Sequence, residues 1–426
     1  MELVRQVMIQ SENKTMAIGR GLRICHLATT RLGGAGIAAS RLHDALFRQA
    51  VASTFLTEDR GARGDLGYAA LPPETRTWFQ RLRSRLGMAS SDRQRWTRQL
   101  ESLDRNGVFA SGPGGRDDLL HDLHVQQADI LNLHWVAGFL PWSVFFRQVR
   151  QPLVWTLHDM QPFKGIFHYS VDRDRAGAAA RQLGERVRLW KRQVLADVAR
   201  QKLTIVTPSR WLGQQSQASE VLGRFPHRVI PYGLNTDVFR PWPRAIARQL
   251  FGLPQDCRLV LVVAERLDDY RKGLDLAAAA LETSGLLPGW EVVAAGAGSM
   301  RFAGRTVHAM GSVPDPRLMA LLFSAVDLVL VPSREDNLPN VILESLCCGT
   351  PVVVTQGGGC PEPVIEGRDG VVSRSLDVRG LKDAVAEAAD IAFDREVISA
   401  AAAARYDQSV AAFAYLQLYG SLVGDL

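Results

Sequence analysis

The chain has 426 residues, a length that suggests two or three domains. Of these residues 46% are apolar and 22% charged, a profile typical of a globular protein and not of a fibrous or low-complexity chain. Fifty basic and 44 acidic residues give a net charge of +6, which suits an anionic ligand but is too small to indicate nucleic-acid binding. Five cysteines without a Cys-x-x-Cys pair predict buried thiols in a cytoplasmic protein. The first twenty residues hold no run typical of a signal peptide, and the uncharged stretch 131–146 is too short for a membrane helix.

Short apolar runs alternate with helical segments along most of the chain. This alternation predicts parallel sheets that helices cover on both faces. In the first half we expect strands at 22–28, 153–157, 203–207 and 228–230 and helices at 36–49 and 181–201. After a proline-rich segment at 226–243 the alternation restarts, with strands at 258–264, 290–295, 328–331 and 351–355 and helices at 275–284, 316–324 and 339–348.

The two halves predict an α/β fold of two Rossmann-like, doubly wound domains that face a central cleft, where open parallel sheets bind their ligands. We place the N-terminal domain at 1–235 and the C-terminal domain at 236–404. A C-terminal helix is expected at 405–426, packing back toward the N-terminal domain.

The segment 74–100 combines seven arginines and two acidic residues with interleaved aromatic and aliphatic side chains. A basic amphipathic segment of this kind can lie on an anionic membrane surface. The alternative, which we favour, is a solvated helical face whose apolar stripe packs on the domain.

Gly34 and Gly36 follow the first strand and open a helix, so backbone N–H groups can approach an anion there. A plain tight turn is the alternative. The pattern Gly34-x-Gly36-x-x-Ala39, followed by Glu58, also matches a dinucleotide-binding fingerprint, which alone is a weak signal.

His158 and Asp159 end an apolar strand, where an imidazole can hydrogen-bond a sugar hydroxyl or a developing charge. The alternative is a structural histidine with Asp159 capping a turn. The string Asp172-Arg-Asp174 follows no apolar strand, and we interpret it as a surface loop and not as a metal site.

Arg266 and Lys272 lie six residues apart on the turn that follows the first strand of the second half. Two cations at such a turn can neutralise a diphosphate. Exposed loop charges are the alternative.

The sharpest pattern joins Asp336 and Glu344 across the start of a helix. Asp336 can accept hydrogen bonds from sugar hydroxyls, and the amides near Asn337 and Leu338 can face a phosphate. Glu344 lies in an apolar run, where a carboxylate needs partners that two ribose hydroxyls would supply. The alternative is a helix-terminal carboxylate and a structural ion pair.

Together these motifs resemble those of the retaining family-4 glycosyltransferases of GT-B fold, most of all enzymes of exopolysaccharide and colanic-acid-type assembly. The resemblance covers most of the chain outside residues 59–127. It rests on Arg266…Lys272-Gly273, Gly296-x-Gly298, Pro332-Ser333…Asp336-x7-Glu344, Cys348-Gly349-Thr-Pro351, Gly358-Gly-Cys-Pro-Glu362, Gly33-Gly-Ala-Gly36, His158-Asp159, Thr207-Pro-Ser209-x-Trp211-Leu212 and Pro231-x-Gly233-x-Asn235-x3-Phe239.

The resemblance implies a nucleotide-diphosphate sugar as donor and a glycan or polyprenyl-linked acceptor held by the N-terminal half. By this resemblance Arg266 and Lys272 would bind the diphosphate, and Glu344 would bind the ribose. Asp336 would bind the donor hexose, and His158 would contact the sugar near its reacting carbon. The nucleobase would lie near the stretch 308–313, which ends at Val313. The family usually has glutamate where this chain has Asp336, which is one methylene shorter.

No carboxylate is placed as a covalent nucleophile, so we expect front-face attack in which the leaving phosphate helps to accept the proton of the acceptor. The cations and a helix N-terminus would stabilise the charge on the leaving diphosphate, and neither a metal nor another cofactor is predicted. Three alternatives stay open: a non-catalytic sugar-nucleotide-binding protein, a nicotinamide-dependent oxidoreductase, and an epimerase of the same fold. We expect a cytoplasmic protein, with peripheral contact to the inner membrane face through 74–100 as one option.

Overall fold

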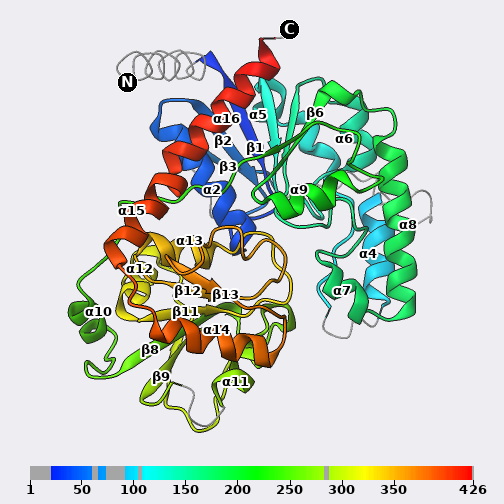
Figure 1. Cartoon of the computed structure of the whole chain (residues 1–426). Coiled ribbons are helices and arrows are strands. Elements are labelled where there is room, and N and C mark those ends of the chain that lie inside the picture. Colours follow the sequence, from blue (N-terminus) through cyan, green and yellow to red (C-terminus); the bar gives the residue numbers. More distant parts are fainter. Residues whose placement is uncertain (1–20, 60–65, 73–91, 104–107, 283–286, 425–426) are drawn as a thin grey trace. The chain divides into compact units, whose positions relative to one another are not determined.

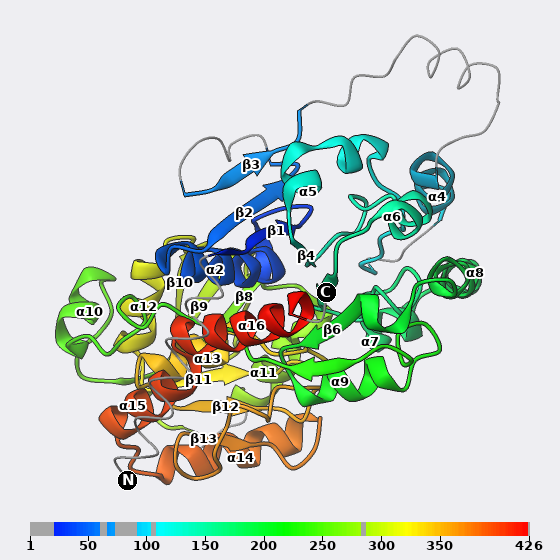
Figure 2. The ribbon, with the colours of Figure 1, turned by 90° about the horizontal axis from the view of Figure 1, so that it is seen from above.

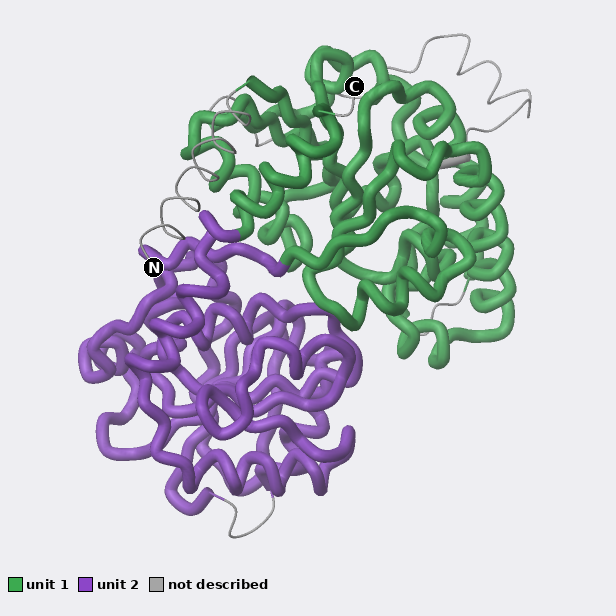
Figure 3. Tube along the Cα trace, turned by 45° about the horizontal axis from the view of Figure 1, so that its top comes forward, with its two compact units in different colours: residues 1–230, 411–426 green, residues 231–410 purple. Residues whose placement is uncertain are grey.

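The computed structural model describes residues 21–59, 66–72, 92–103, 108–282 and 287–424. The chain divides into two compact units, which Figure 3 shows in separate colours. Unit 1 comprises residues 1–230 and 411–426, and unit 2 comprises residues 231–410. The boundaries expected at residues 235 and 404 lie a few residues from these divisions.

Unit 1 is built on a parallel sheet in the order β3-β2-β1-β4-β5-β6-β7. Its strands are β1 (Arg23–Leu27), β2 (Ala52–Thr57), β3 (Tyr68–Ala70), β4 (Ile130–Leu133), β5 (Leu153–Thr156), β6 (Leu203–Thr207) and β7 (His227–Val229). Its helices are α2 (Gly33–Arg48), α4 (Asp92–Glu101), η1 (Asp117–His121), α5 (Leu123–Gln127), α6 (Trp142–Gln148), α7 (Ser170–Arg175), α8 (Ala178–Leu195), η2 (Arg200–Lys202) and α9 (Arg210–Gln217), together with most of α16 (Gln408–Val423).

The two faces of the unit 1 sheet are covered by different helices, because successive side chains of a strand point to opposite faces. On one face Ile24, Ile130 and Val154 pack in one cluster with residues of α2 and α16. These two helices run side by side across the strands in Figures 1 and 2. On the other face Leu131 and Trp155 pack among residues of α6 and α8.

The C-terminal helix α16 is tied to the sheet of unit 1 by two buried hydroxyls. Asn132 Nδ2 donates to Tyr419 Oη over 2.7 Å, and Tyr415 Oη lies 2.9 Å from Thr156 Oγ1. Because these groups are buried, each hydrogen bond fixes the position of the helix on the sheet more than an exposed one would.

Unit 2 repeats the architecture with a parallel sheet in the order β10-β9-β8-β11-β12-β13. Its strands are β8 (Arg258–Arg266), β9 (Trp290–Ala297), β10 (Val307–Gly311), β11 (Leu328–Val331), β12 (Val352–Val354) and β13 (Gly370–Val372). Its helices are α10 (Arg244–Leu250), η3 (Tyr270–Lys272), α11 (Leu274–Leu281), α12 (Pro316–Ala325), α13 (Asn340–Cys347), α14 (Val378–Asp390) and α15 (Arg395–Tyr406). One apolar cluster covers each face of this sheet.

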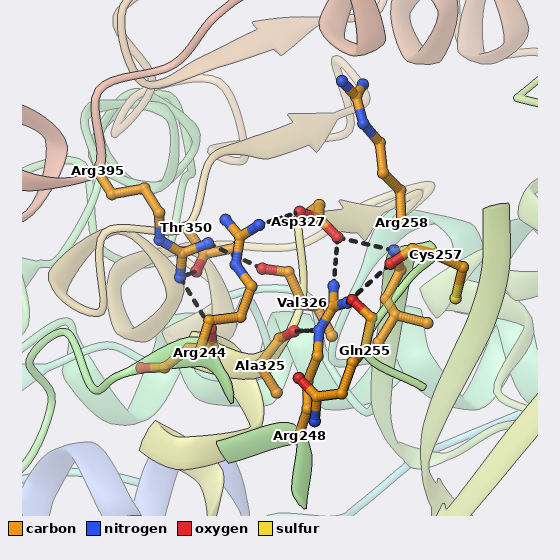
Figure 4. Close-up of polar contacts among 12 residues, drawn as sticks. Arg244, Arg248, Gln255, Cys257, Arg258, Ala325, Val326, Asp327, Thr350 and Arg395 are labelled. Atoms are coloured by element: carbon orange, nitrogen blue, oxygen red, sulfur yellow. Dashed lines mark hydrogen bonds and ion pairs between the residues drawn. The ribbon is translucent and has the colours of Figure 1, made fainter. Parts of the chain in front are cut away.

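An arginine cluster at the amino-terminal side of β11 holds the helices of unit 2 together (Figure 4). Asp327 accepts from Arg244 and Arg248 over 2.7 Å each and also from the backbone N–H of Leu259. Arg395 donates to the carbonyl of Val326, and burial lowers its pKa to about 10. Since these donors point at carbonyls and at one carboxylate, the cluster has a structural role.

Most predicted elements are present, and the differences lie at their ends. The helix expected at 36–49 begins at Gly33, and the one expected at 181–201 begins at Ala178 and already ends at Leu195. The strand expected at 228–230 is β7, which lies one residue earlier. The helix expected to end at residue 284 ends at Leu281, and 283–286 lie outside the described residues.

The structure tests the membrane hypotheses only in part. Among the described residues, no helix combines the length and the apolar character needed to span a bilayer. Residues 1–20 and 74–91 lie outside the described residues. In the described end of the basic segment, Trp96 and Leu100 are buried in one cluster with Leu183 of α8, so these two side chains belong to the core.

Candidate functional site

The site of unit 2 is built around Asp336, in the loop between β11 and α13. This residue is 7% exposed, and its Oδ2 lies 2.7 Å from Lys272 Nζ and 2.9 Å from Arg271 Nη1. Its Oδ1 accepts from the backbone N–H of Asn337. Burial alone would raise the pKa of Asp336, but the charges of Lys272 and Arg271 outweigh it and hold that pKa well below the ordinary value.

Arg334 fastens the loop of Asp336 to η3, which carries both cations. Its guanidinium forms a bidentate pair with Asp275, with two contacts of 2.6 Å, and lies 3.9 Å from the centre of the Tyr270 ring. Its backbone N–H donates to the carbonyl of Arg271 over 2.8 Å. The loops after β8 and β11 therefore form one hydrogen-bonded assembly.

Glycines allow three loops to approach each other at Asp336. A Cβ on Gly273, which has φ +68°, would lie 2.0 Å from the carbonyl oxygen of Pro332. A Cβ on Gly358, which has φ +76°, would lie 2.2 Å from the carbonyl oxygen of Asp336. The backbone N–H of Gly359 donates to that same carbonyl. Asp336 is thus the meeting point of the loops that follow β8, β11 and β12, at the carboxyl ends of their strands.

The structure brings Lys272 and Asp336 together, but it does not bring Arg266 to them. The Arg266 guanidinium is exposed and lies 2.7 Å from Asp268 Oδ2. Arg271, which the sequence analysis missed, takes the place beside Asp336.

The remaining predicted residues of unit 2 lie on or near the same loops. Asn337 is buried, and its Nδ2 lies 3.5 Å from Tyr232 Oη. Leu338 belongs to the apolar core, and Glu344 is 8% exposed in α13. Val313, two residues beyond the end of β10, is half-buried against the core. Its contact with the nucleobase of the donor stays a prediction.

In unit 1 the glycine loop has a structural explanation of its own. Gly33 begins α2 with φ +70°, and Gly34 follows in the first turn. A Cβ on Gly36 would lie 2.4 Å from the backbone carbon of Arg31, so the turn requires this glycine whether or not a ligand is present. Asp59 closes the turn by accepting from the backbone N–H of Arg31.

His158 lies two residues beyond β5 and is 7% exposed. Its Nε2 is 3.1 Å from Nδ1 of His134, whose Nε2 is 2.9 Å from Nδ1 of His26. Burial lowers the pKa of His158 to about 4, so the ring is neutral near pH 7. The histidine at the end of β5 is therefore one of three linked imidazoles, which the sequence analysis did not foresee.

Asp159, the neighbour of His158, is the centre of a second buried network. Its Oδ2 accepts from His168 Nδ1 over 2.6 Å and from Trp135 Nε1 over 3.0 Å, and its Oδ1 accepts from the backbone N–H of Gln161. His168 Nε2 lies 2.7 Å from Ser111 Oγ. The turn at Asp159, which belonged to the alternative interpretation of this motif, is present, and the network fixes the loop that holds His158.

A buried lysine of α8 donates hydrogen bonds to the same loop. Lys191 of α8 donates to the carbonyls of Gln161 and Gly165 over 2.5 and 2.7 Å, and its Nζ lies 4.9 Å from the centre of the Trp142 ring. Burial lowers the pKa of Lys191 well below its ordinary value. A lysine on a polar helix gives no sequence signal of burial, so sequence reasoning missed it.

The acidic string Asp172-Arg-Asp174 was expected in a surface loop, but it lies in the short helix α7, and Asp172 is buried. Within the described ranges, no group of three or more histidine, cysteine, aspartate or glutamate residues has the geometry to hold a metal ion.

Comparison with known proteins shows which family and which relatives parts of this chain resemble. Residues 258–390 match the family described as "Glycosyl transferases group 1". Over 286 residues the chain is 30% identical to the D-inositol 3-phosphate glycosyltransferase of Thermobispora bispora, a match that spans 62% of this chain and 62% of that protein. The chain therefore spans less than two thirds of the length of this curated relative.

Two of the solved structures that resemble this chain cover nearly all of it. The sucrose-phosphate synthase of Thermosynechococcus elongatus has a TM-score of 0.69 at 19% identity, over 95% of this chain and all of that one. Anabaena HepE, in complex with UDP and glucose, has a TM-score of 0.64 at 16% identity, over 94% of this chain and all of that one. These likenesses confirm the predicted fold class, two Rossmann-like domains of GT-B type.

Proposed function

We propose that this protein is a glycosyltransferase that moves a hexose from a nucleoside-diphosphate sugar to an acceptor hydroxyl. The observation that carries the proposal is the buried carboxylate of Asp336 beside Lys272 and Arg271, where three loops, two of them with glycines at the close approaches, meet at the carboxyl end of a parallel sheet. This assembly falls inside the segment that matches the group 1 glycosyltransferases.

The charges of the site suit the proposed chemistry. A diphosphate leaving group gains negative charge as the bond to the sugar breaks, and fixed cations stabilise that charge. Lys272 and Arg271 supply two cations, and Arg266 can add a third once it leaves Asp268. Asp336 would then hold a hydroxyl of the hexose, and Glu344 the ribose.

We further propose that the sugar is transferred with retention and without a metal ion, by front-face attack. Since HepE is solved with UDP and glucose, a uridine nucleotide is the first donor to test. For the acceptor we propose a glycan or lipid-linked intermediate of polysaccharide assembly on the cytoplasmic side of the membrane. Inositol phosphate is the second candidate, because the curated relative is named for it.

A panel of nucleotide sugars, with NAD and NADP in the same plate, tests donor binding by thermal shift. We expect one nucleotide sugar to raise the melting temperature, because a ligand of the native state stabilises it. If only the nicotinamide cofactors do so, the oxidoreductase alternative replaces this proposal. Transfer in the presence of EDTA, with the product anomer read by NMR, tests metal independence and retention.

Lys272→Gln tests the assignment within the site. We expect turnover to fall by about 10²–10³, the scale seen when one stabilising donor is removed from a developing negative charge. Lys382→Gln, on α14, is the matched control and should transfer normally. Equal turnover in both variants would contradict the role of Lys272.

A further inference from the structure

Three histidines form a hydrogen-bonded row across neighbouring strands of unit 1. His26 lies in β1, His134 directly follows β4 and His158 follows β5, and these strands are adjacent and parallel. The ring nitrogens are 2.9 Å apart between His26 and His134 and 3.1 Å apart between His134 and His158. Both distances are hydrogen-bond lengths.

The row runs diagonally toward the carboxyl edge of the sheet. His26 is paired with Asn132 in the register, so His134 lies two residues further along its strand. Asn132 in turn is level with Val154, so His158 lies two residues further again than His134. Exposure increases in the same order, from 0% through 2% to 7%. The carboxyl edge is where parallel sheets bind ligands.

The inner end of the row determines where its protons lie. Within the described part of the chain, Nε2 of His26 is buried and has no hydrogen-bond partner. A proton on that nitrogen would leave an N–H buried without an acceptor, which native structures avoid more strictly than an unused lone pair. His26 therefore holds its proton on Nδ1, and donates it to Nε2 of His134.

Each neutral imidazole has one protonated and one bare nitrogen, so the first tautomer sets the next two. Nε2 of His134 accepts, so its Nδ1 is protonated and donates to Nε2 of His158. Nε2 of His158 then accepts as well, and its proton is on Nδ1. Burial, the largest cause, lowers the pKa of all three rings. The neighbouring rings of the row and His43 lower the pKa of His134 further, His43 does the same for His26, and Asp159 raises the pKa of His158.

We propose that His26 and His134 are positioning residues that hold His158 as the Nδ1–H tautomer, with its only lone pair occupied by His134. His158 is then a hydrogen-bond donor and not a base. This consequence for the reaction rests on the proposed function, and it leaves the proton of the acceptor to the leaving phosphate. The tautomers themselves do not depend on any activity.

The direct test is ¹⁵N NMR of the histidine rings in the full-length protein at pH 7, without substrate. We expect a protonated Nδ1 and a bare Nε2 on His26, His134 and His158, although free histidine favours the opposite tautomer. Signals are assigned by the single variant that removes each ring. A protonated Nε2 on His158 overturns the proposal, even if the protein later proves to transfer sugar.

His26→Phe removes the imidazole at the inner end of the row. The ring of Phe55 already stacks on His26, so an aromatic ring suits this position. We expect His158 to become a mixture of tautomers and kcat for transfer to fall about fivefold with little change in the donor KM. His43→Phe is the matched control. It lies edge-on to His26, but its nitrogens contact Ser53 and the carbonyl of Leu66, outside the row.

The two readouts separate the possible failures. If the NMR shows the expected tautomers and no donor is turned over, the proposed function is wrong and the proton arrangement stands. If transfer occurs and His26→Phe leaves both the His158 tautomer and kcat unchanged, the positioning role is wrong.

Discussion

Lowering the pH from 7.5 to 5.5 should destabilise unit 1 through its buried histidines. Burial lowers the pKa of His26, His43, His134 and His158 in the folded state, to about 4 for His158. The unfolded chain has ordinary histidines with a pKa near 6.5 and therefore binds protons that the folded unit excludes. The stabilisation is complete above pH 6.5 and is lost as the pH falls toward the folded pKa values.

The magnitude follows from the two pKa values. A histidine with pKa near 6.5 when unfolded that stays neutral when folded lowers the free energy of unfolding by about 1.4 kcal/mol between pH 7.5 and 5.5. Four such residues give about 5 kcal/mol as an upper limit, which is comparable to the whole stability of many domains. Carboxylates titrate mainly below this window, so histidines dominate the change.

Urea unfolding at pH 7.5, 6.5 and 5.5 measures this effect, with tryptophan fluorescence as the probe. Trp142 and Trp155 are buried in unit 1, so replacing Trp242 and Trp290 by phenylalanine reduces the signal from unit 2. In the His26→Phe background the change should shrink by about 1.4 kcal/mol, because one proton-excluding group is gone. A free energy of unfolding that is constant from pH 7.5 to 5.5 would refute the reasoning.

Two further substitutions test the packing around each site. Arg334→Ala removes the bidentate pair with Asp275 and loosens the loop that presents Asp336, so it should raise the donor KM more than it lowers kcat. Steady-state kinetics measure both constants. An unchanged KM would contradict the role of Arg334 in holding this loop. Tyr419→Phe leaves the buried side-chain amide of Asn132 in β4 without its acceptor and should lower the free energy of unfolding, measured by urea titration, by about 1–3 kcal/mol. An unchanged free energy would mean that this hydrogen bond does not hold α16 in place.

Burial on both faces did not by itself make a strand predictable: β5, β6, β8 and β11 were predicted, whereas β2 was missed, and so was β4, which is buried along its whole length. The continuous apolar runs of β6, β8 and β11 predict their strands closely. β10 was missed as well; it is an edge strand whose residues are partly or fully exposed. β13 was missed too; it has three residues, like β7 and β12, which were predicted.

At the site of unit 2, Lys272 and Asp336 were candidates from the sequence, and Arg271 was not. The spacing of Lys272 and Asp336 reflects two loops that follow neighbouring strands, β8 and β11, so their meeting is a property of the topology. Which arginine joins them is decided by side-chain geometry. Arg266 finds a carboxylate two residues away at Asp268, whereas Arg271 lies on η3 and reaches Asp336. Nothing in the sequence distinguishes the two.

The histidine row was not predictable, because its members are far apart in the chain and belong to no local motif. His26 and His134 are separated by 108 residues, and only the order β1-β4-β5 brings them together. A histidine near the end of a strand is common, so one of them alone indicates little. The register of the sheet, which no local pattern encodes, makes them neighbours.

The two units bury their titratable groups in opposite ways, and this makes the acid response diagnostic. Unit 1 keeps four buried histidines, His26, His43, His134 and His158, neutral, so it loses stability as the pH falls below about 6.5. In unit 2 the pKa values of Asp336 and Asp275 lie below their ordinary values, so the stability they contribute is complete above pH 4 and is lost only at lower pH. Hydrogen exchange at pH 5.5 should therefore show β1 and β4 opening while β8 and β11 stay protected, corrected for the intrinsic pH dependence of exchange. Equal opening of both sheets would mean that the buried histidines do not set the acid response.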